Sequence, residues 1–155
     1  MPHRQGCRIV IALLSVALGC GEAAAAVPVI EATPACAYRK LGTVEAEAGA
    51  RIKEDSMDKR PSPASYVKAF DSLSKAAQSL GANAVVLRSH RATYFTYFGR
   101  RTREAVHIDL SGAAIHIEGD PAQCAVTVLD PNDYRRAGSN RGVVETTSDQ
   151  AYRSE

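Results

Sequence analysis

The amino-acid sequence predicts an α+β domain in which one long helix packs on a small, mainly antiparallel sheet of about four strands. Three observations lead to this fold class. A helical stripe of apolar residues lies in the middle of the chain, and short apolar runs with strand character lie on both sides of it. The chain has 155 residues, of which 45% are hydrophobic and 23% charged, as in an ordinary globular protein. One domain is therefore expected, and a collagen-like, wholly disordered or polytopic membrane chain is excluded.

The helix is expected between residues 62 and 81. Ser62 precedes Pro63, a combination typical of an N-cap followed by proline at the first helical position. Apolar residues then recur at steps of four and three, which places on one helix face Tyr66, Phe70, Leu73, Ala77 and Leu80. Gly81 is expected to end the helix in the left-handed conformation. We assign this apolar face to the core of the domain rather than to a binding site.

Strands are expected on both sides of the helix, at residues 36–46, 84–97, 102–110 and 124–129. Gly42 predicts a β-bulge, because the alternation of polar and apolar residues changes phase there. A bulge or turn at Gly112 would place the apolar residues before and after it on one face of the sheet. Two polar segments, 49–60 and 98–101, are expected to form a loop and a turn.

The first 26 residues have the three parts of a secretory signal. Its start is positively charged through Arg4 and Arg8. An apolar run follows at residues 9–18, and small residues end the signal at 23–26. The apolar run is shorter than the roughly 20 residues that a membrane-spanning helix needs. We therefore expect an exported, periplasmic protein that is cleaved after Ala26.

The alternative is lipidation at Cys20, because Leu18-Gly19-Cys20 partly matches the lipobox of bacterial lipoproteins. The protein would then contact a membrane through its acyl chains and reside at the outer membrane. After the signal, the sequence predicts a leader at 27–35, the α+β domain at 36–130 and a disordered tail at 131–155. The tail is assigned from its polar composition, rich in glycine, serine and asparagine.

Cleavage after Ala26 leaves two of the four cysteines, Cys36 and Cys124. An even number of cysteines in an oxidising compartment predicts a disulfide bond between them. A thiol–disulfide enzyme is disfavoured, because the sequence contains no C-x-x-C motif.

Three segments resemble a family of small bacterial envelope proteins. Residues 41–44 (L-G-T-V) resemble its opening strand, residues 81–87 (G-A-N-A-V-V-L) its helix-to-strand connection, and residues 103–115 its closing strands. The family contains the RcsF-like stress sensors and the YbjQ-like domains, and the resemblance covers residues 38–117. It implies a divergent member that is not an enzyme and has no cofactor. Such a protein would act through contacts with envelope proteins or with anionic components of the envelope.

Arginines surround the aromatic segment 94–98, and residues 88–103 contain no carboxylate. The candidate contact residues are Arg88, Arg91, Arg100, Arg101 and Arg103, with His90 beside them. Export argues against nucleic acid as the partner, although arginines among aromatics would suit it. Phosphate groups of envelope lipids or acidic envelope proteins fit arginine equally well. The alternative is a charged strand edge that prevents aggregation.

Two histidine–carboxylate pairs, His107-x-Asp109 and His116-x-Glu118, each place both side chains on one face of a strand. If the two strands paired, the four side chains could gather into a metal site. The alternative is a pair of exposed polar faces, which the alternation with apolar residues already explains.

Enzymatic activity is not expected from the motifs. The sequence contains no G-x-S-x-G, no H-E-x-x-H and no glycine-rich phosphate loop. Binding therefore remains the expected activity.

Overall fold

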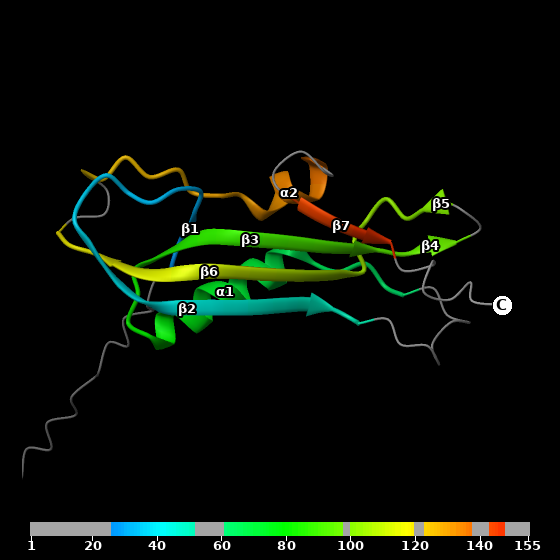
Figure 1. Ribbon diagram of the computed structural model, residues 1–155, viewed down its shortest axis with the longest axis horizontal. Helices are drawn as coiled ribbons and strands as arrows, with labels where there is room; N and C mark the ends of the chain where they lie inside the picture. Colours follow the sequence, from blue (N-terminus) through cyan, green and yellow to red (C-terminus); the bar gives the residue numbers. More distant parts are fainter. Residues whose placement is uncertain (1–25, 52–60, 98–99, 120–122, 138–142, 148–155) are drawn as a thin grey trace, which may run out of the picture.

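The central strand of the sheet is β6 (His107–Ile117), which pairs antiparallel with β2 (Tyr38–Gly49) on one side and β3 (Ala84–Tyr94) on the other (Figure 1). The computed structural model describes the residues 26–51, 61–97, 100–119, 123–137 and 143–147. The predicted export signal, Cys20 and most of the charged loop lie outside these residues.

Two short strands pair parallel with the outer edge of β3, at opposite ends of it: β1 (Val29–Ile30) and β7 (Val143–Thr147). Beyond β3, a small separate hairpin is formed by β4 (Thr96–Tyr97) and β5 (Arg100–Arg101). The described helices are α1 (Tyr66–Ser79) and α2 (Pro131–Ala137), and neither is long and apolar enough to cross a membrane.

Helix α1 covers one face of the mostly antiparallel sheet, as Figure 1 shows. The main core lies between them and combines apolar residues of α1 with those that β2, β3 and β6 direct toward it. Its fully buried members include Leu73, Val85 and Ile108. The predicted fold class, one helix packed on a small mainly antiparallel sheet, is confirmed.

The first turn of α1 begins three residues later than predicted. Ser65, not Ser62, is the N-cap, and its hydroxyl accepts a hydrogen bond of 3.3 Å from the backbone N–H of Lys68. The residues before it are held extended, because the N–H of Ala64 donates to the carbonyl of Ala105 at 2.7 Å. That bond ties the segment before α1 to the connection that leads into β6.

The predicted apolar face of α1 is buried except at its last residue. Tyr66, Phe70, Leu73 and Ala77 are buried, whereas Leu80 is 46% exposed. Leu80 is the C-cap and has left the helical path, so its side chain no longer continues the stripe.

The end of α1 is closed by a pair of backbone hydrogen bonds around Gly81. Gly81 donates to the carbonyl of Gln78 and Ala82 donates to the carbonyl of Ala77, which is a Schellman motif. This geometry requires the left-handed φ of 75° that Gly81 adopts, as predicted. Asn83 then fixes the connection to the sheet. Its side-chain amide donates to the carbonyl of Ile117 at 3.0 Å and accepts from the Ile117 N–H at 2.7 Å.

The bulge predicted at Gly42 is confirmed, since the register of β2 against β6 shifts between Lys40 and Gly42. The break predicted at Gly112 is wrong, because β6 runs without interruption from His107 to Ile117. The second bulge instead lies in β3, between Leu87 and Ser89.

Strand β6 therefore directs apolar residues to both faces of the sheet. Ile108 and Leu110 belong to the main core below α1, whereas Ile115 and Ile117 belong to a second core on the opposite face. The apolar residues of β6 change from even-numbered to odd-numbered positions because they change from one face of the sheet to the other, and not because the strand contains a bulge.

Other strand boundaries differ from the prediction as well. Strand β3 ends at Tyr94, and the expected strand 102–110 contributes only its last four residues to β6. Residues 124–129 form no regular strand and make a single bridge, between Ile30 and Val128. They run across the second core as a strap (residues 123–130), with Cys124 and Val126 packed against it.

The disulfide between Cys36 and Cys124 is present, as predicted, with 5.9 Å between the two Cα atoms. It attaches the strap to the segment that leads into β2, and both sulfur-bearing residues contact the second core. The bond joins residues 88 apart in sequence. It thereby links the two ends of the domain.

The segment expected to be a leader contributes to the core. Val29 and Ile30 are buried as strand β1, and the Ser74 hydroxyl donates to the Val27 carbonyl at 2.6 Å. Segment 131–155, predicted to be disordered, contains α2 and β7 within its described residues. Helix α2 is held by Tyr134, whose ring lies 5.4 Å from that of Phe70.

A buried histidine lies below α2. His90 of β3 lies 3.1 Å from the hydroxyl of Tyr66 through its Nε2 and contacts the Tyr134 ring edge-on at 5.1 Å. Its Nδ1 has no hydrogen-bond partner among the described residues. Burial among aromatic rings lowers the pKa of His90 from its ordinary value of 6.5.

Removing the disulfide should strongly destabilise the domain. For a closed loop of this length, the chain-entropy account gives a contribution of about 4–5 kcal/mol. Unfolding of the Cys36→Ser, Cys124→Ser double variant in urea, compared with the oxidised wild type, measures the loss. A difference below about 1 kcal/mol would contradict this account.

Replacing Gly49 by alanine should cost more stability than replacing Gly81 by alanine. Both glycines have positive φ, 91° and 75°, so each variant loses about 1–2 kcal/mol to the left-handed conformation. Only at Gly49 would the added Cβ meet another group, since it would lie 2.1 Å from the carbonyl oxygen of Val106. Urea unfolding measures the loss of stability in each variant. Equal losses in the two variants would contradict this prediction.

Acidification should destabilise the wild type more than a His90→Gln variant. Because the pKa of His90 is lowered by folding, its neutral form contributes fully above pH 6.5. That contribution is lost as the pH falls through this value toward the pKa of the folded state. Unfolding free energies at about pH 7.5 and about pH 5 test this for both proteins. The same loss in both would show that His90 carries no part of the pH dependence.

Candidate functional site

The face of the sheet that points away from α1 has an apolar half and a polar half. The second core and the strap cover the half formed by the end of β6. The half formed by the start of β6 carries polar side chains, because the pairing places Glu47 of β2 and Arg91 of β3 opposite Asp109. His107 is two residue pairs further along, opposite Gly49 and Thr93.

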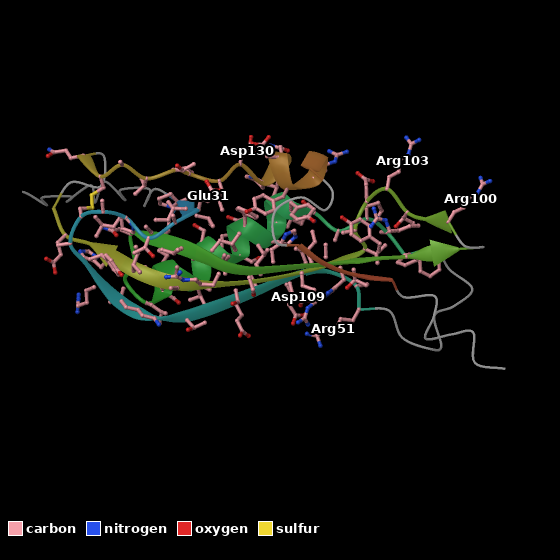
Figure 2. All side chains as sticks on the ribbon, turned by 45° about the horizontal axis from the view of Figure 1, so that its top comes forward. Glu31, Arg51, Arg100, Arg103, Asp109 and Asp130 are labelled. Atoms are coloured by element: carbon pink, nitrogen blue, oxygen red, sulfur yellow. A yellow bond between two sulfur atoms is a disulfide. The ribbon has the colours of Figure 1, made fainter. Side chains whose placement is uncertain are left out.

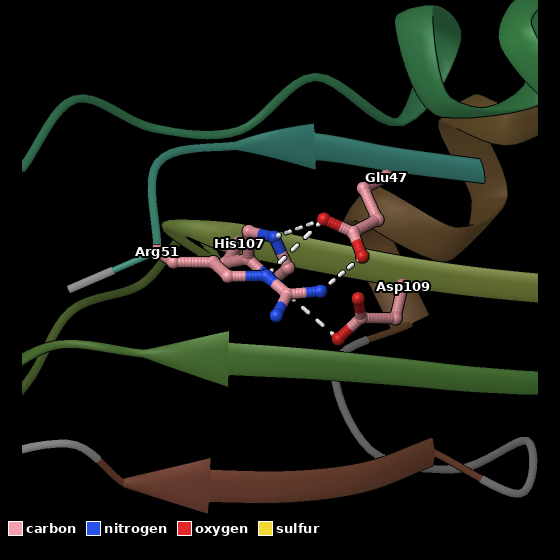
Figure 3. A network of polar contacts seen from close by, with 4 residues as sticks. All are labelled: Glu47, Arg51, His107 and Asp109. Carbon is pink, nitrogen blue, oxygen red and sulfur yellow. Dashed lines mark hydrogen bonds and ion pairs between the residues drawn. The ribbon is translucent and has the colours of Figure 1, made fainter.

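Four charged or titratable side chains meet on this polar half and are here named the His107 cluster: Glu47, Arg51, His107 and Asp109 (Figure 3). The imidazole of His107 lies between the two carboxylates. Its Nε2 is 3.5 Å from Oε2 of Glu47, and its Nδ1 is 3.4 Å from Oδ2 of Asp109. His107 is buried, although its side chain lies on the face of the sheet that points away from α1.

Arg51 binds Glu47 through two atoms of its guanidinium group, with 3.2 Å between Nε and Oε2. This pairing lowers the pKa of Glu47 and raises the pKa of Arg51. The charge of Asp109 contributes further to the raised pKa of Arg51. Both carboxylates are therefore near the positive charge of Arg51, and Arg91 lies opposite Asp109 in the register.

The cluster opens into a cavity of about 340 Å³, which Glu47, Arg51 and Asp109 line together with Ser89 and Ser111. The two serine hydroxyls lie 3.2 Å apart across β3 and β6. Arg91 and Glu45 also line this cavity, together with the apolar Ala46 and Leu110.

The structure brings together only half of the predicted metal-ligating residues. His107 and Asp109 lie in the cluster, whereas His116 and Glu118 lie near the other end of the same strand, about 30 Å away at the rise of an extended chain. The prediction assumed two paired strands, and residues 107–117 are one strand. His116 contacts the carbonyl of Gly81 at 3.3 Å, and Glu118 is exposed.

The predicted arginines fall into two groups. Arg100, Arg101 and Arg103 lie on β5 and the following connection, where Figure 2 shows Arg100 and Arg103 pointing outward. Arg88 and Arg91 lie on β3 instead, at separate places. Arg88 occupies the bulge and donates to the hydroxyl of Thr33 at 3.2 Å, and Arg91 lies beside Asp109.

Two members of the first group, Arg101 and Arg103, border a pocket of about 750 Å³. Arg101, Arg103 and Arg135 line it together with Glu104 and the residues before α1. Arg135 is paired with Glu104 at 3.1 Å, and the guanidinium of Arg101 lies 4.5 Å above the ring of Tyr94. We call Arg100, Arg101, Arg103 and Arg135 the arginine end of the domain.

Three participating residues could not be found from the sequence. Glu47 and Arg51 join the His107 cluster through the register of β2 on β6, and Arg135 joins the arginine end through the packing of α2. A Glu–Arg pair four residues apart was visible, but on a strand and its following loop that spacing predicts no contact.

The comparisons with known proteins give no family for this chain. No family model matches the sequence, and no curated protein matches it significantly.

Proposed function

We propose that this protein is exported to the periplasm and acts there without catalysis, by binding phosphate groups of envelope lipids at its arginine end. The proposal includes kinship with the RcsF-like and YbjQ-like envelope proteins, on the sequence resemblance described above. Three arginines and one glutamate around a single pocket are the observation that carries it.

The disulfide supports the compartment. Cys36 and Cys124 are the two cysteines that remain after cleavage of the predicted signal, and they are bonded to each other. Such bonds form and persist in oxidising compartments and are rare in the cytosol.

The arginine end supports phosphate as the ligand. Guanidinium groups bind phosphate oxygens in a bidentate manner, and they lose less hydration than lysine when they do so. Among the described residues no carboxylate pairs with Arg100 or Arg103, whereas Arg135 is neutralised in part by Glu104. The pocket therefore has an excess of positive charge that a bound anion would balance.

Replacing Arg100 and Arg103 by serine should weaken binding to vesicles that contain anionic phospholipid or lipopolysaccharide. Each basic residue near an anionic surface contributes about 1 kcal/mol, so a loss of about tenfold or more is expected. Arg101 is left in place because it contacts Tyr94. Vesicle co-sedimentation at low salt measures the affinity.

The matched control is the double variant Arg39→Ser, Lys40→Ser. It removes the same charge from exposed residues at the start of β2, at the opposite end of the sheet. An equal loss in both variants would reduce the effect to net charge and contradict a specific site. The lipid proposal also fails if the Arg100→Ser, Arg103→Ser variant still binds vesicles normally and loses only the capture of an envelope protein. That protein would then be the partner.

A further inference from the structure

We propose that Glu47, His107 and Asp109 form a binding site for a first-row divalent metal ion of the zinc type, for which Arg51 is a built-in competitor. This inference is independent of the proposed function, because it concerns the other face of the molecule and different residues.

The donor atoms are already gathered. One ligand atom from each of the three side chains can be chosen so that all lie within 4.8 Å of one another. Backbone pairing holds them there, since Glu47 is opposite Asp109 in the register and His107 is two residues from Asp109 on the same face. Paired strands thus position all three residues: His107 and Asp109 lie on the central strand β6, and Glu47 lies on the edge strand β2.

The spacing suits an ion of this size. Zinc binds nitrogen and oxygen ligands at about 2.0–2.2 Å, so neighbouring ligands of a tetrahedral ion lie about 3.4 Å apart. The separation between His107 Nε2 and Glu47 Oε2 is 3.5 Å. Asp109 faces the other ring nitrogen and must turn about its side-chain bonds to complete the set. Its side chain is 34% exposed, so it has room to do so.

The electrostatics also favour a divalent cation. The two carboxylates carry two negative charges, and a divalent ion balances both. In the structure Arg51 pairs with Glu47, and Arg91 lies opposite Asp109 in the register. The side chain of Arg51 is 68% exposed, and such exposed ion pairs are weak. Arg51 can therefore move into water when a metal ion takes its place.

The donor set selects the kind of metal. An imidazole nitrogen with carboxylate oxygens suits zinc and its first-row neighbours, whereas calcium and magnesium prefer oxygen ligands alone. The adjoining cavity of about 340 Å³ gives the ion a path from solvent and leaves space for water to complete its coordination.

Zinc titration by calorimetry tests the site, with the chelator-treated, disulfide-bonded exported protein. The wild type should bind one equivalent of Zn²⁺. His107→Gln and Glu47→Gln should each weaken binding at least about tenfold. Glu47 is exposed, so its variant keeps the test valid if the buried histidine cannot be replaced without loss of folding. Arg51→Gln should tighten binding severalfold, because it removes the competing cation.

His116→Gln is the matched control. His116 lies on the same strand, with Glu118 at the same spacing as Asp109 from His107, but no third ligand approaches it among the described residues. Zinc affinity should not change in this variant. The proposal fails if the wild type takes up no zinc at about 0.1 mM, a weak affinity for a protein site. It also fails if His116→Gln loses as much as His107→Gln, or if Arg51→Gln binds zinc more weakly than the wild type.

Discussion

The rest of the structure depends on the burial of β6 on both faces. Ile108 at its start and Ile117 at its end are almost fully buried, yet they lie on opposite sides of the sheet. One side is covered by α1. The other needs a second cover, because apolar side chains exposed there would lose the favourable free energy of burial. The strap provides that cover, and the disulfide holds the strap against the sheet.

The position of the polar site follows from this arrangement. The strap covers only the half of the outer face that belongs to the end of β6, so the other half stays accessible. There the outward-facing positions of the central strand are His107 and Asp109, and the paired edge strand adds Glu47. The bulges in β2 and β3 allow both neighbours to keep their hydrogen bonds to β6 while their own side chains change faces. The same register shifts therefore shape the core and the polar surface.

Local signals were sufficient for some parts of this structure and insufficient for others. The buried face of α1 was predictable down to single residues such as Leu73, because a helix with one covered side repeats its apolar residues regularly. The disulfide followed from counting cysteines.

The continuity of β6 was missed because a strand buried on both faces loses its alternation and resembles two strands with a break. The His107 cluster was half predicted: the His-x-Asp pair is local, whereas Glu47 reaches it only through pairing between distant segments. For the same reason, the polar composition of the last residues did not reveal that Tyr134 packs against Phe70.

The outer edge of β3 has a consequence for handling the protein. Two short strands from opposite ends of the chain share this edge, β1 at Val85–Val86 and β7 at His90–Tyr94 (Figure 1). Trimming either end would uncover backbone donors and acceptors that can template the addition of a foreign strand. Between the two strands lies the charged bulge residue Arg88, a feature that hinders such edge-to-edge assembly. Truncations that remove β1 or β7 thus carry a risk of aggregation, although each of these strands is short.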